Sequence, residues 1–232
     1  MIGEVSIVRA TFFSTHHASA ADALAGRERE FTAPTYPLLV ARARRFTSLV
    51  TQLHIEVCGA IHDPAAEPPA AVFATRHGEI QASERLIADF REAAMVSSAR
   101  FALSVHNAAS GVYAVAVGAN APSTTITGAN AIAGGWLEAA LTVLDEDRPV
   151  LLSIADEPVP AALKDPGPPY GVAAAFLLAP RQAPGRRAKL SLVPGDGEIN
   201  ALHVLAEATG DRAATIVLGR TQPRTMLALA LS

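Results

Sequence analysis

The segment from Ser123 to Leu144 has the pattern of a strand, a turn and a helix that would hold a reactive side chain at the turn. Gly128 permits a sharp turn, and the residues after it favour a helix by composition and periodicity. A side chain at this turn would lie over a helix N-terminus, where unpaired N–H groups and the helix dipole favour an anion. Acyl-transfer enzymes often place a thiolate in such a setting. This chain has Asn130 there, and an amide cannot form a thioester.

Other residues that could support catalysis or bind a metal do not form a convincing set. His106 and Asn107 precede an expected helix, where they form an N-cap or belong to an interface. A dyad of His106 with Ser104 would lack an orienting acid and an oxyanion site. The single Cys58 excludes an internal disulfide and a cysteine-based zinc site, and the histidines lack metal-ligand spacing. We therefore predict no metal and no cofactor.

Hydrophobic periodicity predicts alternating strands and helices up to about residue 155, and mainly strands after it. Strands are expected at 4–13, 70–75, 123–127, 150–155, 171–179, 188–193, 214–218 and 225–231. Helices are expected at 19–29, 40–62, 80–93, 107–117, 131–144 and 199–208. The strands at 171–179 and 188–193 are expected to pair with each other. This order predicts an α/β fold with a mixed central sheet flanked by helices, in one domain that covers 1–232.

Composition narrows the class of protein further. Half of the 232 residues are apolar, only 18 % are charged, and the formal net charge is −3. The low charge content suits a buried partner face, or simply an alanine-rich composition. A net negative charge without a Lys/Arg cluster argues against a nucleic-acid-binding protein. The sequence shows neither a signal peptide nor an apolar run long enough to span a membrane, so we expect a cytoplasmic protein.

Four segments, in order, resemble the short β-ketoacyl synthase-like proteins of bacterial aryl polyene (xanthomonadin-type) pigment pathways, which are often called chain-length-factor-like. The segments are VFATRHGEI at 72–80, RFALSVHNAASGVYAVA at 100–116, the elbow TTITGANAIAGGWLEAAL at 124–141, and VLLSIADEPVP at 150–160. SVHNAASG is the most specific of these pieces. The resemblance implies the N-terminal half of a thiolase-like fold.

The resemblance also implies which catalytic groups this chain lacks. In ketoacyl synthases this half carries the nucleophilic cysteine at the elbow, and counting back from LEAAL places that position at Asn130. The second half supplies two catalytic histidines, in motifs that resemble PHGTGT and NSFGFGG, and neither motif occurs here. A full synthase is also nearly twice as long. The resemblance therefore implies a non-catalytic subunit that keeps the scaffold and pairs with a complete ketoacyl synthase.

Within this interpretation, several elbow residues have two possible roles. Asn130 is either an N-cap, a degenerate nucleophile position that borders the acyl path, or both. Ile132 and Trp136 lie four residues apart on one helix face, so they are core residues or candidates for closing an acyl tunnel. Gly134 and Gly135 each cost up to about 1 kcal/mol relative to alanine inside a helix. A close approach by another backbone, such as that of a partner, would explain them.

The expected partner interface centres on the strand of the elbow. In this family the two elbow strands are expected to meet across the dimer. The predicted contact residues are therefore Ser123, Thr124, Thr125, Ile126 and Thr127. Gly134, Gly135, His106 and Asn107 are further interface candidates. An acyl carrier protein is expected as a transient partner of the assembly.

The resulting prediction is a chain-length-factor-like subunit that helps a ketoacyl synthase to extend carrier-bound aryl polyene, polyketide or fatty acyl chains and shapes the acyl tunnel. Two alternatives remain open. One is a stand-alone acyl hydrolase or transferase that uses Ser or His, although no Gly-x-Ser-x-Gly elbow is present. The other is a module that binds an acyl carrier protein without an enzyme partner.

Overall fold

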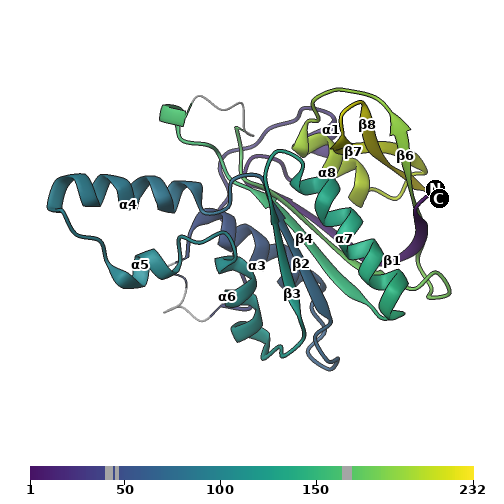
Figure 1. Ribbon diagram of the computed structural model, residues 1–232, viewed down its shortest axis with the longest axis horizontal. Coiled ribbons are helices and arrows are strands. Elements are labelled where there is room, and N and C mark those ends of the chain that lie inside the picture. Colours follow the sequence, from purple (N-terminus) through teal and green to yellow (C-terminus); the bar gives the residue numbers. More distant parts are fainter. Residues whose placement is uncertain (40–43, 45–46, 164–168) are drawn as a thin grey trace.

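The described part of the chain contains one mixed sheet of eight strands (Figure 1). The computed structural model describes residues 1–39, 44, 47–163 and 169–232. Its strands are β1 (Gly3–Ser14), β2 (Ala70–Thr75), β3 (Ser123–Thr127), β4 (Val150–Asp156), β5 (Val172–Ala179), β6 (Arg186–Pro194), β7 (Ala214–Gln222) and β8 (Thr225–Leu231). Their order in the sheet is β3-β2-β4-β5-β1-β6-β8-β7. β2 is parallel to β3 and β4, and the remaining neighbours are antiparallel.

Helices cover both faces of this sheet. They are α1 (Ala20–Leu24), α3 (Leu49–Ile61), α4 (Ile80–Ala93), α5 (Ser98–Ala102), α6 (Ala108–Val117), α7 (Ala131–Glu146) and α8 (Ala201–Thr209), with a short 3₁₀ turn at Ala161–Leu163. α7 and α8 pack on one face together with the larger core cluster, while α3 and α6 pack on the other face (Figure 1). This layering confirms the predicted α/β class with a mixed central sheet flanked by helices.

Burial along the strands explains their apolar sequences. Every residue of β2 and of β4 is buried, as expected for central parallel strands covered by helices on both faces. β3 has the composition of an edge strand instead, with threonine and serine side chains that are exposed or half-buried. The side chains of β3 are therefore mostly polar. Its backbone N–H and C=O groups on the open edge can still pair with another strand.

The predicted pairing of the strands near 171–179 and 188–193 is wrong. β1 lies between β5 and β6, and it pairs with both of them. Twelve residues make β1 long enough to do this: Phe12 lies opposite Ala174 of β5, and Val5 lies opposite Ala188 of β6. Two strands that follow each other in the sequence commonly pair as a hairpin. Here β1 forms one hydrogen-bonded ladder with β5 and another with β6.

Two predicted helices are shorter in the structure. The helix expected at 19–29 is α1, which ends at Leu24 before Gly26 adopts a φ of +65°. The one expected at 40–62 is observed as α3 from Leu49, where the Ser48 hydroxyl accepts from the Thr51 N–H. Of its earlier part, residues 40–43 and 45–46 lie outside the described residues. Within the described residues no helix is long and apolar enough to cross a membrane.

Helices α4 and α5 form an arm that extends from one end of the molecule (Figure 1). Leu86 is the one residue of α4 that is buried, and α5 has none. The arm exposes large apolar side chains: Ile87, Phe90, Met95, Val96 and Phe101. Such a surface is unusual for a protein that has no partner in solution.

Candidate functional site

The elbow has the predicted geometry. β3 leads into α7 through Gly128, whose φ of +110° favours glycine. The Gly128 N–H donates to the Arg76 carbonyl at 3.0 Å, and the Ala131 N–H donates to the Gly128 carbonyl at 2.9 Å. Asn130 occupies the N-cap position of α7 and is exposed. Asn130 occupies the N-cap position, but among the described residues its side-chain amide accepts no hydrogen bond from the first turn of α7.

Strand β7, near the end of the chain, packs against the start of α7. Gly219 of β7 has a φ of +143°, and a Cβ added there would lie 3.3 Å from the Ala133 Cβ and 3.9 Å from the Asn130 Oδ1. The sheet therefore curls until β7 reaches the start of α7. This contact joins residues 89 positions apart in the sequence (219 minus 130), and the sequence pattern gave no sign of it.

A cavity of about 470 Å³ adjoins the elbow. It lies beside the first residues of α7 and α8, and Ile132 is part of its wall. Its lining is Arg76, Gly128, Ala129, Ala131, Ile132, Asp156, Pro169, Tyr170, Glu198, Ile199, Asn200, Ala201 and Leu202. This set of described residues includes no cysteine, serine, threonine or histidine. The described lining therefore offers no thiol, aliphatic hydroxyl or imidazole, and its ionisable side chains are Arg76, Asp156, Tyr170 and Glu198.

The two tunnel candidates lie in different environments. Ile132 lines the elbow cavity and can contact a ligand there. Trp136 is fully buried, and its ring centroid lies 4.7 Å from that of Phe176 in the core between α7 and the sheet. The core interpretation of Trp136 therefore fits its surroundings, and Ile132 remains the tunnel candidate at this end.

The two glycines of α7 have an explanation within the chain. A Cβ added at Gly134 would lie 2.9 Å from Ile126, and one added at Gly135 would lie 2.7 Å from the Ala74 Cβ. α7 therefore approaches β2 and β3 too closely for a side chain at either position. The close approach that the two glycines predict therefore occurs within the chain, and Gly135 is buried in the chain's own core.

The other predicted interface residues lie at or near the β3 edge. Ser123, Thr124 and Thr127 are exposed, and Thr125 and Ile126 are half-buried. His106 and Asn107 are exposed as well, just before α6. The backbone of His106 packs against Gly78, and Asn107 sits at the N-cap of α6 without a side-chain capping bond among the described residues. A partner could reach all of these residues except Gly135, so the interface remains a prediction.

A group of buried carboxyls at the same end of the sheet was missed in the sequence. Asp156 accepts from the Arg76 N–H at 2.6 Å and from the Thr75 hydroxyl at 3.1 Å. Glu157 accepts from the Val50 and Gln81 N–H groups at 3.1 and 3.0 Å, and so joins the starts of α3 and α4. The position of these residues just after a buried strand was the available signal, because the carboxyl ends of parallel strands meet at one edge.

Burial controls the ionisation of these groups. Desolvation raises the pKa of Asp156 to about 6 and that of Glu157 to about 7, and it also raises the pKa of Glu79. The Thr51 hydroxyl donates to Glu79 at 2.5 Å. Raised carboxyl pKa values occur in catalytic acids, but each of these groups bonds to the chain itself. We interpret them as structural groups that fix the root of the arm.

Two serine–histidine pairs occur in the described part of the chain, and both are buried. Ser14 lies 2.9 Å from the His17 Nδ1, and Ser153 lies 2.8 Å from the His54 Nδ1. All four side chains are buried, and desolvation lowers the pKa of His54 to about 3. A substrate could not reach either hydroxyl. Among the described residues no group of three or more His, Cys, Asp or Glu could hold a metal ion.

Comparison with known proteins gives a family and a fold. The family model described as β-ketoacyl synthase, N-terminal domain, matches residues 17–215. No curated protein sequence matches the chain.

Among solved structures, the chain is similar to a chain of the ketosynthase ApeO in complex with its chain length factor ApeC from Xenorhabdus doucetiae. The TM-score is 0.79 at 19 % identity, with 98 % of this chain and 99 % of that chain covered. A second is a chain of AntDE:AntF, a type II polyketide synthase carrier protein in complex with its ketosynthase bound to the hexaketide. Its TM-score is 0.71 at 12 % identity, with 99 % of each chain covered.

A third similar structure is the ishigamide ketosynthase/chain length factor. Its TM-score is 0.65 at 16 % identity, with 83 % of this chain and 68 % of that chain covered. At these identities the likeness establishes the fold, and the predicted thiolase-like class is confirmed.

Proposed function

This chain belongs to the β-ketoacyl synthase N-terminal domain family, and we propose that it is a non-catalytic, chain-length-factor-like subunit of a ketoacyl synthase complex. The observation that carries this proposal is the elbow. It keeps the backbone geometry that would hold a nucleophile, but Asn130 stands at that position, and the described lining of the adjoining cavity includes no cysteine, serine or threonine. The similar structures that contain a chain length factor support the same role.

In this role a complete synthase supplies the chemistry. Its cysteine holds the growing acyl chain as a thioester, and its histidines promote decarboxylation of a carrier-bound malonyl unit. The resulting carbanion attacks the thioester carbonyl, a carbon–carbon bond forms, and the cysteine thiolate leaves. The present chain shapes the acyl tunnel, and the product is a carrier-bound polyene or polyketide chain. Ile132 is the tunnel candidate at the elbow.

The surface of the molecule supports a large interface. Among the described residues β3 pairs with β2 alone, and its other edge is open to a strand from the partner. A five-residue strand alone cannot bury the roughly 1,200–2,000 Å² that a stable complex requires. The apolar arm and Val115 of α6, which is 86 % exposed, would supply the remainder.

Co-expression with a complete ketoacyl synthase, followed by size-exclusion chromatography, tests this proposal. We expect one heterodimer peak, and poor solubility of the chain expressed alone. Val115→Asp with Phe90→Asp should weaken the complex by at least about tenfold, because each places a charge in an apolar contact. Leu192→Asp is the matched control, since this residue is also exposed but lies on β6, far from β3 in the sheet. A well-behaved monomer that does not bind the synthase would refute the proposal.

The alternatives have their own tests. A stand-alone hydrolase would turn over acyl thioesters as the purified chain, which the buried serine–histidine pairs argue against. A carrier-binding module would bind an acyl carrier protein equally well with and without the synthase. Binding that depends on the synthase supports the proposed subunit.

A further inference from the structure

Two buried carboxyl groups lie at the root of the arm formed by α4 and α5. Glu79 and Glu157 are each 3 % exposed. Glu79 is the N-cap residue of α4, and Glu157 directly follows β4. The pair therefore joins the start of the arm to the central sheet, in a place where an ionised carboxylate costs far more to bury than a neutral carboxyl group.

Glu157 connects the start of α4 to the body of the molecule. Its Oε2 accepts from the Val50 N–H of α3 at 3.1 Å, and its Oε1 accepts from the Gln81 N–H of α4 at 3.0 Å. The Gln81 side chain also donates to the Pro158 carbonyl at 2.9 Å. Because both oxygens of Glu157 accept from N–H groups at helix N-termini, this residue is suited to carry a negative charge.

Glu79 has fewer hydrogen bonds. The Thr51 hydroxyl of α3 donates to its Oε1 at 2.5 Å, whereas its Oε2 is buried and has no hydrogen-bond partner among the described residues. An unpartnered neutral carboxyl group is far less costly in such a place than an unpartnered charge. A proton held by the pair is therefore placed on Glu79.

The surroundings favour retention of this proton. Burial and the nearby Glu79 charge raise the pKa of Glu157 to about 7, against the opposing effects of its N–H donors and of the exposed Arg85. Burial also raises the pKa of Glu79, although the Ser48 and Thr51 hydroxyls oppose it. Two interacting carboxyls of this kind titrate as a unit.

The other titratable groups at the root belong to neighbouring elements. Burial raises the pKa of Asp156, a third carboxyl, to about 6, and the charges of Arg76 and His77 oppose this effect. On α3, burial lowers the pKa of His54 to about 3, so its ring is uncharged at neutral pH. His106, at the other end of the arm, packs through its backbone and Cβ against the turn before α4. The root as a whole is therefore rich in buried acids.

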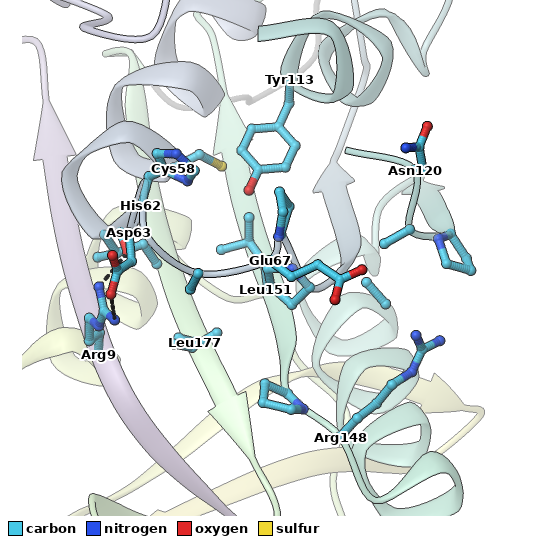
Figure 2. A pocket seen from close by; sticks show the side chains of 18 residues that line it. Arg9, Cys58, His62, Asp63, Glu67, Tyr113, Asn120, Arg148, Leu151 and Leu177 are labelled. Atoms are coloured by element: carbon cyan, nitrogen blue, oxygen red, sulfur yellow. Dashed lines mark hydrogen bonds and ion pairs between the residues drawn. The ribbon is translucent and has the colours of Figure 1, made fainter. Parts of the chain in front are cut away.

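Carboxyl groups at the opposite end of the sheet have a different environment. A second cavity, of about 550 Å³, lies there between α3, α6 and the first residues of β2 and β4, and Figure 2 shows Asp63 and Glu67 in its lining. Glu67 is exposed, and Asp63 pairs with Arg9 at 3.3 Å. Charge on these two carboxyls is solvated or paired, whereas charge on Glu79 is neither.

We propose that Glu79 and Glu157 form a proton-dependent latch that holds the arm against the body of the molecule. While the arm is docked, Glu79 keeps a proton and Glu157 carries the charge that binds the starts of α3 and α4. When the proton passes to water, the pair has two buried negative charges, and movement of the α4 start away from α3 hydrates them. Little packing opposes this movement, since Leu86 is the one residue of α4 that is buried. The latch lies within this chain, so it operates whether or not the chain joins a synthase.

The direction of the pH effect follows from proton binding. The docked arm holds the proton more tightly than the released arm, in which the two carboxyls return to their ordinary pKa of 4.5. Docking is therefore strongest below pH 4.5, weakens as the pH rises toward about 7, and stays weak above that value.

Hydrogen exchange of the full chain in dilute solution tests the latch. Protection factors, which exclude the intrinsic pH dependence of exchange, are measured for α4 and α7 at about pH 5.5 and about pH 8.5. We expect α4 to lose protection at least about tenfold at the higher pH, while the protection of α7 changes less than about twofold. No loss in α4, or an equal loss in α7 that indicates global unfolding, would overturn the proposal.

Substitutions identify the group responsible. Glu79→Gln keeps the size of the side chain but cannot ionise, so α4 should have the same protection at both pH values within about twofold. Glu84→Gln is the matched control, because Glu84 is exposed on the same helix, and this variant should lose protection as the natural chain does. A pH-dependent loss that persists in Glu79→Gln would refute the latch.

Glu157→Gln tests the other half of the pair. It replaces one acceptor oxygen by an NH₂ group, so the N–H of either Val50 or Gln81 loses its acceptor. We expect lower protection of α4 at both pH values. Protection equal to that of the natural chain at the lower pH would show that Glu157 does not hold the arm.

Discussion

The two ends of the sheet differ in whether the sequence predicts a site there. At the carboxyl end, the sequence of the elbow predicts a site for chemistry, but the described lining of its cavity includes no cysteine, serine, threonine or histidine. At the amino end, residues 63–69 resemble only a proline-rich connection, yet they form one wall of the larger and more apolar cavity. Reactive residue types can be recognised in the sequence. An apolar binding site has no such residues, and only the arrangement of ordinary side chains creates it.

The largest expected effect concerns the nucleophile. In the reconstituted complex, replacing the elbow cysteine of the synthase by alanine should lower condensation by on the order of 10³-fold or more, because the thioester cannot form. Asn130→Ala in this chain should change the rate less than about threefold. Steady-state product formation measures both. A loss of similar size from Asn130→Ala would mean that this elbow takes part in the reaction.

Trp136→Ala should destabilise the chain by about 3–5 kcal/mol, since it removes a fully buried ring from the core beside Phe176. The free energy of unfolding in urea measures this. Leu144→Ala on the same helix should cost much less, because Leu144 is 44 % exposed. A stable Trp136→Ala protein with altered product lengths would restore Trp136 as a tunnel residue.

The carboxyls at the elbow end predict a pH-dependent effect. The folded-state pKa of Asp156, about 6, is above its ordinary value of 3.8, so ionisation costs folded-state stability. This cost is absent at low pH, grows as the pH rises from 3.8 to 6, and is constant above that range. Asp156→Asn keeps an acceptor for both hydrogen bonds, so it should raise stability at pH 8 by on the order of 2–3 kcal/mol.

The same substitution should have little effect near pH 4, where both residues are neutral. Unfolding curves at the two pH values measure the difference. Asp145→Asn is the control, since Asp145 is exposed on α7. A stability gain of equal size at both pH values would show that charge burial is not its cause.

The smallest effect compares the two cavities through product length. Tyr113→Ala enlarges the cavity at the amino end of the sheet and should lengthen the mean product. Ile132→Ala enlarges the cavity at the elbow and should broaden the products less. Mass spectrometry of the carrier-bound products measures both variants. A larger shift from Ile132→Ala would place the end of the acyl chain at this elbow instead.

Much of the fold could be predicted because the signals are local. The helix α4 and the strands β2 and β3 have the predicted bounds, since apolar spacing and turn residues determine them within a few positions. The pairing of the strands near 171–179 and 188–193 failed because it depends on β1, more than 150 residues earlier. The capping bonds expected of Asn130 and Asn107 also failed, since capping depends on side-chain orientation as well as residue type.

Most elements and the identity of the residue at position 130 follow from the sequence, because helix and strand preferences are short-range and a residue type is the same whatever the fold. Tertiary structure alone decided that β1 separates β5 from β6, that Gly219 lies over Asn130, and that α3, α6 and β4 enclose a space beside the start of β3. Each of these depends on contacts between distant segments, whose geometry follows from packing a whole sheet against its helices and not from any one stretch of residues.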